Sequence, residues 1–282
     1  MDANTALKLL ALNQRFYQNF AHQFSKTRQR LQPGVQKILQ TIPPGSKILD
    51  LGCGNGELAR ALGRKGHHGA YVGVDFSPVL LTEASRITPG RLPAQFILAD
   101  LAAPGWEANL PVSTFDLVLA FAVLHHIPGA YNRREILHRA HALLVPEGRL
   151  IHSEWQFLNS PRLVARIQPW EMAGLSAHDV DPGDYLLDWR RGGLGFRYVH
   201  SFSHAELGEL AAEKARVRFR NTQEVVGALT GEVDGISCAD DSLSGLAENR
   251  LPHFVVETRL PGQADARSES FLVVVIPPPV PF

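Results

Sequence analysis

The stretch that determines the predicted fold reads SKILDLGCGNGELARAL and spans residues 46–62. It opens with a short apolar run that is typical of a buried strand, and the run leads into a glycine-rich loop. An amphipathic segment from Glu57 onward predicts a helix directly after the loop. In a doubly wound sheet such a turn lets the backbone approach a ligand, and the helix presents free N–H groups to it. The stretch therefore predicts a ligand-binding turn at the carboxyl end of a strand.

Short β-rich runs alternate with helical segments along the rest of the chain, a pattern typical of an α/β protein with a mostly parallel, doubly wound sheet. A helical region, 7–39, comes first and breaks at Pro33 and Gly34. Further helices are predicted at 57–64, 78–87 and 133–144, the last with a capping box formed by Asn132 and Glu135. The predicted strands are residues 47–51, 70–74, 94–98, 115–120, 149–155, 216–220 and 254–259.

We expect one domain over residues 1–282. Its parts are an N-terminal helical lead-in (1–45), a ligand-binding core (46–155), a lid-like insertion with a helix (156–215), closing strands with a loop predicted to be mobile (216–260), and a tail (261–282). The insertion is assigned because the regular alternation is lost over 161–197, where prolines and a Gly-Gly pair interrupt the pattern. It lies between the fifth and sixth strands, where it would cover a site.

Composition narrows the class of protein. With 45% hydrophobic and 20% charged residues, the chain is typical of a globular protein. It has neither a long apolar run nor a charged leader followed by one, so we expect a cytoplasmic protein without a membrane span. Two cysteines, Cys53 and Cys238, are too few for a disulfide framework or a zinc site, and no metal is expected. The net charge of zero argues weakly against a broadly basic surface.

The glycine loop does not fit a dinucleotide fingerprint. That fingerprint is G-x-G-x-x-G, whereas the sequence from Gly52 reads GCGNGE and places Glu57 where a glycine is needed. The pattern is instead D-x-G-x-G-x-G, with Asp50 at the end of the strand. A carboxylate there is a poor partner for a pyrophosphate and a good partner for an ammonium or sulfonium group.

This motif resembles the first motif of class I S-adenosylmethionine-dependent methyltransferases, and later motifs follow in order: YVGVDFS, QFILADL, FDLVLAFAVLHHIP and LLVPEGRLIHSEW. The resemblance implies a seven-stranded Rossmann-like sheet and S-adenosyl-L-methionine as cofactor. It implies that Asp75 binds ribose and that Asp100 contacts the adenine amine. Two alternatives remain: Asp75 as a carboxylate at a helix terminus, and Asp100 as a turn cap. The implied cofactor-binding residues are Asp50, Gly52, Gly54, Gly56, Asp75, Phe76, Asp100, Leu101 and Phe121.

Two flanking regions resemble the tRNA wobble-uridine carboxymethyl methyltransferases. The N-terminal piece matches a Y-x-x-x-A-x-x-F-S-x-T-R pattern, and the insertion matches a G-D-x-x-x-x-W element followed by R-Y-x-H-x-F. The chain departs from the family at Gln32, where the family has Trp, and at Val199, where it has Tyr. The matching residues are Tyr17, Ala21, Phe24, Ser25, Thr27, Arg28, Gly183, Asp184, Trp189, Arg197, Tyr198, His200 and Phe202.

The candidate catalytic residues are Arg28, Arg197 and His125. The two arginines lie in matched motifs and are suited to a phosphate or a substrate carboxylate, although a solvated basic face is the alternative. His125 follows an apolar strand at the predicted ligand edge. Three functions remain open at this point: a tRNA methyltransferase, a small-molecule carboxylate or hydroxyl methyltransferase, and a non-catalytic cofactor-binding partner subunit. The sequence also leaves open the oligomeric state and the need for an activating partner subunit.

Overall fold

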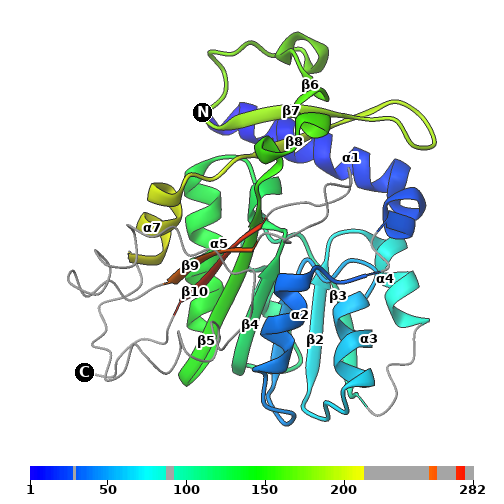
Figure 1. Ribbon diagram of the computed structural model, residues 1–282, viewed down its shortest axis with the longest axis vertical. Helices are drawn as coiled ribbons and strands as arrows, with labels where there is room; N and C mark the ends of the chain where they lie inside the picture. The colour runs from blue at the N-terminus through cyan, green and yellow to red at the C-terminus, as the bar shows by residue number, and fades with distance from the viewer. Residues whose placement is uncertain (28–29, 87–91, 213–253, 259–270, 277–282) are drawn as a thin grey trace.

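The computed structural model describes residues 1–27, 30–86, 92–212, 254–258 and 271–276, the last two segments as backbone only (Figure 1). Its main sheet has the strand order β3-β2-β1-β4-β5-β10-β9. Neighbours among β1 to β5 pair in parallel, β10 runs antiparallel to β5, and β9 runs antiparallel to β10. The strands are β1 (Ile48–Leu51), β2 (Tyr71–Asp75), β3 (Ala94–Leu98), β4 (Phe115–Phe121), β5 (Leu144–Trp155), β9 (Phe254–Thr258) and β10 (Phe271–Ile276).

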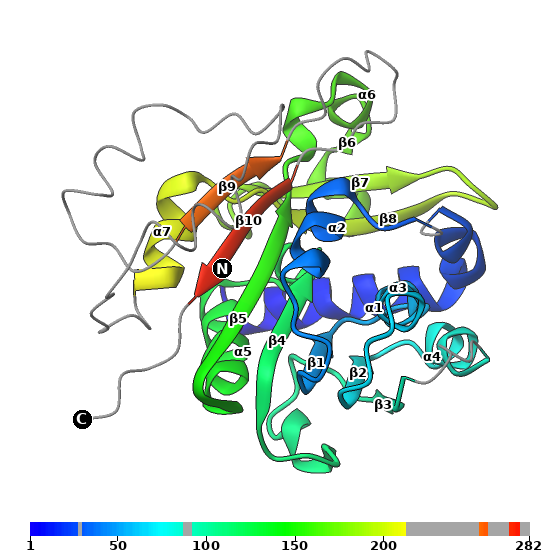
Figure 2. The same cartoon turned by 60° about the horizontal axis from the view of Figure 1, so that its bottom comes forward.

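Helices cover both faces of this sheet (Figures 1 and 2). The cluster on one face includes residues of α2 and α3, and the cluster on the other face includes residues of α5 and α7. The helices are α1 (Ala3–Thr27), α2 (Pro33–Gln40), α3 (Glu57–Arg64), α4 (Pro78–Ser85), α5 (Ala130–Ala142), α6 (Pro161–Val164) and α7 (His204–Ala212). Four short 3₁₀ turns are η1 (Trp106–Asn109), η2 (Leu124–His126), η3 (Phe157–Asn159) and η4 (Trp170–Ala173).

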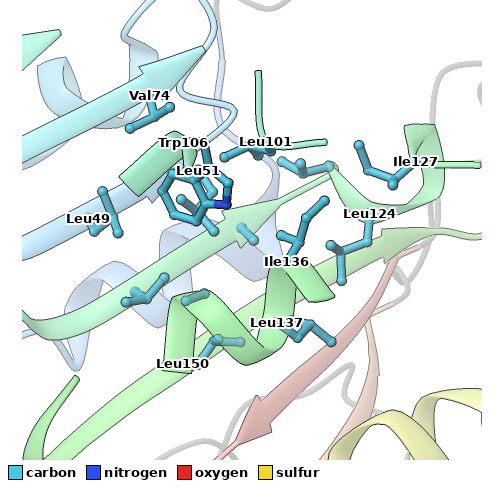
Figure 3. Packing of buried hydrophobic residues seen from close by; sticks show 14 of the residues in the cluster. Leu49, Leu51, Val74, Leu101, Trp106, Leu124, Ile127, Ile136, Leu137 and Leu150 are labelled. Atoms are coloured by element: carbon cyan, nitrogen blue, oxygen red, sulfur yellow. The ribbon is translucent and has the colours of Figure 1, made fainter. Parts of the chain in front are cut away.

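The sheet is buried on both faces, which explains why its central strands are nearly continuous apolar runs. Successive side chains of a strand point to opposite faces, so Leu49 and Leu51 join the cluster under α5 while Ile48 joins the cluster under α2 and α3. Figure 3 shows the cluster under α5, to which Leu49 and Leu51 of β1 and Ile136 and Leu137 of α5 belong. Because the strands are buried on both faces, the positions of their carboxyl ends, where the candidate site lies, are fixed.

A second, three-stranded sheet follows β5 and lies with α1 across one end of the main sheet (Figure 1). Its strands are β6 (Ile167–Gln168), β7 (Asp184–Trp189) and β8 (Gly195–His200), all antiparallel. Asn13 of α1 joins these parts. Its side-chain amide donates to the carbonyls of His126 and Tyr198 at 2.9 and 3.2 Å, and its oxygen accepts the Tyr198 N–H at 2.8 Å. α1 is thereby attached to both β8 and η2.

The mostly parallel α/β architecture is confirmed, while several boundaries and one cap differ from expectation. The capping box is wrong: α5 begins after Gly129 without a side-chain cap, and the Asn132 amide donates to the Pro128 carbonyl. β5 begins at Leu144, where a helix end was expected. The strands β7, β8 and β10 were not predicted. The expected strand at 216–220, residues 221–253 of the closing segment with its predicted loop, and the end of the tail, 277–282, lie outside the described residues.

Candidate functional site: a cavity at the carboxyl edge of the sheet

A cavity of about 230 Å³ lies where the ends of the parallel strands meet α1. The strands contribute Asp50, Asp75, Phe121 and Ser153, and α1 contributes residues such as Tyr17. Its other lining residues include Leu10, Asn13, Gln14, Phe24, Arg30, Gln32, Gly52, Cys53, Gly54, Asn55, Glu57, Phe76, Ala99, Asp100, Leu101, Ala122, Val123, His125, His126 and Trp155. Eight of the nine predicted cofactor-binding residues, all except Gly56, therefore line one cavity.

Each of the three loop positions requires glycine for a different structural reason. All have positive φ angles, 67° at Gly52, 54° at Gly54 and 79° at Gly56, a region that disfavours other residues. A Cβ at Gly52 would meet Val123 Cγ2 at 2.6 Å, and one at Gly56 would meet the backbone of Ala84 at 3.1 Å. A Cβ at Gly54 would meet nothing within 4 Å. Gly52 and Gly56 permit close packing, whereas Gly54 keeps the loop backbone open to the cavity.

Asp50 lies one residue before the end of β1 and is a buried carboxyl group. Burial raises its pKa to about 7, a hydrogen bond from the Tyr71 hydroxyl opposes that rise, and the nearby Asp75 carboxylate adds to it. The ionised form is disfavoured because burial removes the charge from water. None of the described residues that affect this pKa carries a positive charge. A ligand with a positive charge would supply a cationic partner. The cavity therefore favours a cation beside Asp50.

Asp75 ends β2 and holds the loop in place. Its carboxylate accepts the Gly54 N–H at 2.9 Å and the Ser77 N–H at 2.8 Å. Burial raises its pKa to about 6 against these backbone hydrogen bonds. Asp75 thus contacts the start of α4, as the helix-terminus interpretation expected, and it also lines the cavity.

Asp100 follows β3 and connects that edge to α1. It accepts the Ala102 N–H at 2.9 Å, which is the expected turn cap, and the Gln14 side-chain amide at 2.8 Å. Leu101, Phe76 and Phe121 add apolar walls to the same cavity. The predicted adenine and ribose residues are therefore at neighbouring strand ends.

His125 lines the cavity from η2 and contacts a buried carboxylate behind it. Its Nδ1 lies 2.8 Å from Glu154 Oε2, and its backbone N–H donates to the same oxygen at 3.1 Å. The other oxygen, Oε1, lies 3.0 Å from His152 Nδ1. Burial acts to raise the pKa of Glu154, but hydrogen bonds from His125 and His152 outweigh it and leave the pKa lowered.

Arg197 has a different environment from the one expected. It is 5% exposed, and its guanidinium lies 4.9 Å from the Trp155 ring centroid, 5.5 Å from that of Phe16 and 5.9 Å from that of Trp189. Trp155 lines the cavity, while Arg197 is not among the described lining residues. Arg28 lies outside the described residues. Substrate contact by either arginine stays a prediction.

Sequence reasoning did not select several side chains that form the site. Asn13, Gln14 and Tyr17 of α1 line the cavity, and Glu154 and Ser153 belong to the end of β5. Tyr17 had a signal, because it lies in the matched N-terminal motif. Glu154 had none, because a carboxylate within an apolar strand shows its partners only when the fold is known.

Two further findings apply to the described residues. No group of three or more His, Cys, Asp or Glu side chains there is placed to hold a metal ion. None of the helices in this part of the chain combines the length and apolar character needed to cross a bilayer.

Comparison with known proteins identifies the family. A methyltransferase domain matches residues 21–212, well over half of the chain and all of the cavity-bearing core. The chain belongs to the methyltransferase-domain family. The predicted assignment as an S-adenosylmethionine-dependent methyltransferase is therefore confirmed, and S-adenosyl-L-methionine is its cofactor.

Curated relatives of this methyltransferase act on different acceptors according to their names. A tRNA (carboxymethyluridine(34)-5-O)-methyltransferase of Schizosaccharomyces pombe is 30% identical over 140 residues, which cover 49% of this chain and 55% of that protein. A trans-aconitate 2-methyltransferase of Escherichia coli is 30% identical over 151 residues, covering 52% and 54%. The chain thus spans about half the length of these relatives.

Solved methyltransferase structures share the fold. One from Methanosarcina mazei has a TM-score of 0.53 at 18% identity and covers 89% of this chain and 99% of that one. The plantazolicin methyltransferase BpumL, solved with S-adenosylhomocysteine, has a TM-score of 0.55 at 14% identity, covering 98% and 96%. At these identities the similarity concerns the fold alone.

Proposed function

We propose that this methyltransferase transfers the methyl group of S-adenosylmethionine to an oxygen nucleophile inside the cavity at the carboxyl edge of the sheet. One observation supports the location above all: the open backbone at Gly54 lies in the same cavity as the carboxyl groups of Asp50, Asp75 and Asp100. The bound cofactor supplies a methyl group on a sulfonium, which is already a good leaving group. The chain's own residues then have to position the acceptor and exclude water.

Each acidic side chain has a role in this proposal. Asp50, whose ionised form needs a cation, faces the positively charged part of the cofactor. Asp75 accepts hydrogen bonds from the ribose hydroxyls while it keeps the loop in place through Gly54. Asp100 receives the adenine amine beside Gln14. Gly52 and Gly56 allow the loop to pack closely enough for this arrangement.

The lid of the cavity, in our proposal, consists of α1 together with the second sheet, within a single methyltransferase domain. Asn13 supports this role, because it attaches α1 to β8 and to η2 through buried hydrogen bonds. Arg197 packs β8 against Trp155 of the core. We therefore place the contribution of Arg197 in the shape of the acceptor pocket, through the aromatic ring that it contacts.

The first candidate acceptor is a carboxymethyl group on the wobble uridine of a tRNA. It is supported by the matched N-terminal and insertion motifs and by the name of the Schizosaccharomyces pombe relative. Arg30 is exposed and lines the cavity, and Arg15 and Lys26 are exposed on α1, so cations are available for phosphates. The second candidate is a small molecule with a carboxylate or hydroxyl group, which is favoured by the roof that α1 forms over the cavity.

Salt dependence separates these two acceptors. A tRNA held through six or more phosphates should lose affinity by about 10³-fold between about 50 and 200 mM salt, and a small carboxylate should show little change. We would measure filter binding of total tRNA for the protein and for Lys26→Ala, with Lys65→Ala at the far end of α3 as the control. If the tRNA carboxymethyl group is the acceptor, nucleoside analysis after reaction should show a methyl ester. Salt-insensitive binding and unmodified nucleosides would reject tRNA in favour of a metabolite.

A further inference from the structure

The group that carries this inference is the carboxylate of Glu154 between two imidazoles. Its side chain is 0% exposed, those of His125 and His152 are 2% and 0% exposed, and each carboxylate oxygen faces one Nδ1 atom. An isolated buried charge of this kind would be costly, so the pair of imidazole contacts is what keeps it ionised. Only His125 of the three lines the cavity.

These contacts determine which nitrogen of His125 carries the proton. An ionised carboxylate only accepts hydrogen bonds, so the Nδ1 atom at 2.8 Å must be protonated. The Trp155 N–H also lies 3.4 Å from Nδ1, but the shorter contact with the charged group decides the tautomer. In the neutral ring, the lone pair is then on Nε2. A histidine held this way has the form of a general base, as in a nucleophile–histidine–carboxylate arrangement.

We propose that His125 is the general base of the transfer, that Glu154 is its positioning residue, and that the acceptor atom is a hydroxyl oxygen rather than a carboxylate. This inference rests on the proposed function and, of its candidate acceptors, selects the small molecule with a hydroxyl group over the carboxymethyl group of a tRNA. The acceptor oxygen forms the bond to the methyl carbon as the C–S bond breaks and leaves its electron pair on sulfur. The hydroxyl proton passes to Nε2 of His125. Glu154 stabilises the resulting imidazolium, which then releases the proton to solvent.

The chemistry of carboxylate and hydroxyl acceptors explains why we infer a hydroxyl. A carboxylate has an ordinary pKa near 4 and is already ionised at neutral pH, so a general base would contribute nothing. A hydroxyl must lose its proton during the transfer, and a positioned base accelerates such a step by about 10²–10⁴-fold. The buried His–Glu pair at the cavity wall can act as a base only in the second case.

Ser153 supports a polar acceptor at the same place. It precedes Glu154 on β5, lines the cavity and is 1% exposed. Among the described residues its hydroxyl has no hydrogen-bond partner. Buried hydroxyl groups are normally paired, so this one is expected to bond a polar atom of the ligand. A hydroxyl acceptor can both accept from Ser153 and donate to His125.

The first test reads the tautomer without any acceptor. ¹⁵N spectra of histidine-labelled protein, with His125→Gln to assign the ring, should show His125 protonated at Nδ1 and unprotonated at Nε2 at neutral pH. Protonation at Nε2 in the wild-type protein would overturn the inference, whether or not an acceptor is known. Calorimetry with S-adenosylhomocysteine is run on the same samples. If S-adenosylhomocysteine binds while Nε2 of His125 is protonated, this inference fails and the proposed function stands. If S-adenosylhomocysteine does not bind, the proposed function itself fails.

The second test reads the product. Methyl-labelled S-adenosylmethionine is incubated with a deproteinised cell extract and with total tRNA, and the product is treated with mild alkali. An ether keeps its label, whereas an ester releases volatile methanol. We expect alkali-stable label that falls on the order of 10²-fold in His125→Gln and at least 10-fold in Glu154→Gln, with exposed His178→Gln as control. Alkali-labile product, or unchanged transfer by Glu154→Gln, would contradict the inference.

Discussion

At the residue scale, two buried carboxyl groups contribute a pH dependence to the stability of the fold. Their pKa values in the folded protein, about 7 for Asp50 and about 6 for Asp75, exceed the ordinary value of 3.8. The folded state therefore holds more protons than the unfolded state between about pH 4 and 7, and the stability that these protons contribute is lost as the pH rises through that window.

Asp50→Asn should remove much of this effect, because the amide stays neutral. We expect the free energy of unfolding of the wild-type protein to fall relative to that of Asp50→Asn by on the order of 1–3 kcal/mol between pH 5 and pH 8. Urea denaturation of both proteins without ligand at the two pH values measures the difference. A difference that stays constant with pH, or one that grows in favour of the wild type, would contradict the assignment of a raised pKa to Asp50.

Two alanine substitutions in the glycine loop should have different effects. Both residues have positive φ, so each substitution strains the backbone by about 1–2 kcal/mol. Gly52→Ala adds a steric conflict with Val123, whereas Gly54→Ala meets open space. Melting temperatures should therefore fall further for Gly52→Ala. Calorimetry should show that Gly54→Ala remains folded and binds cofactor poorly, and normal cofactor binding by Gly54→Ala would show that the ligand lies elsewhere.

At the element scale, the buried side chain of Asn13 helps to hold α1 over the cavity. Asn13→Ala removes its hydrogen bonds with the Tyr198 N–H and with the carbonyls of His126 and Tyr198, at a cost of about 1–3 kcal/mol. Hydrogen exchange should speed up in α1 and β8 and remain slow in β1 and β4. Asn19→Ala, exposed on the same helix, is the control. Equal exchange in both variants would mean that packing alone holds α1.

Some of the strands could be predicted from the sequence and others could not. The strands β1, β2 and β4 were predicted because burial on both faces makes them apolar runs and because motif residues lie at or directly after their ends. The sequence did not predict β7 and β8, because prolines and glycines around them obscured the alternation of apolar and polar residues that is typical of a strand. The contact of Glu154 with His125 joins residues 29 positions apart, so only the folded chain reveals it.

At the scale of the whole molecule, the carboxyl ends of the parallel strands and α1 line one cavity. The second sheet lies beside α1 (Figure 2). The main sheet brings the predicted cofactor-binding residues together at its carboxyl edge, and α1 with the second sheet lies across that end. The core motifs therefore predict the cofactor, whereas in our proposal the acceptor depends on the lid. Catalysis then rests mainly on orientation and on the exclusion of water, with His125 as the proposed base.

The central claim is that the cavity at the carboxyl edge binds S-adenosylmethionine through its acidic side chains. Titration calorimetry with S-adenosylhomocysteine tests it most directly, on the wild-type protein, on Asp75→Asn and on exposed Glu171→Gln as control. We expect one ligand per chain, with affinity weakened by about 1.5–3 kcal/mol in Asp75→Asn and unchanged in Glu171→Gln. Absence of binding by the wild-type protein, or full affinity in Asp75→Asn, would contradict the account.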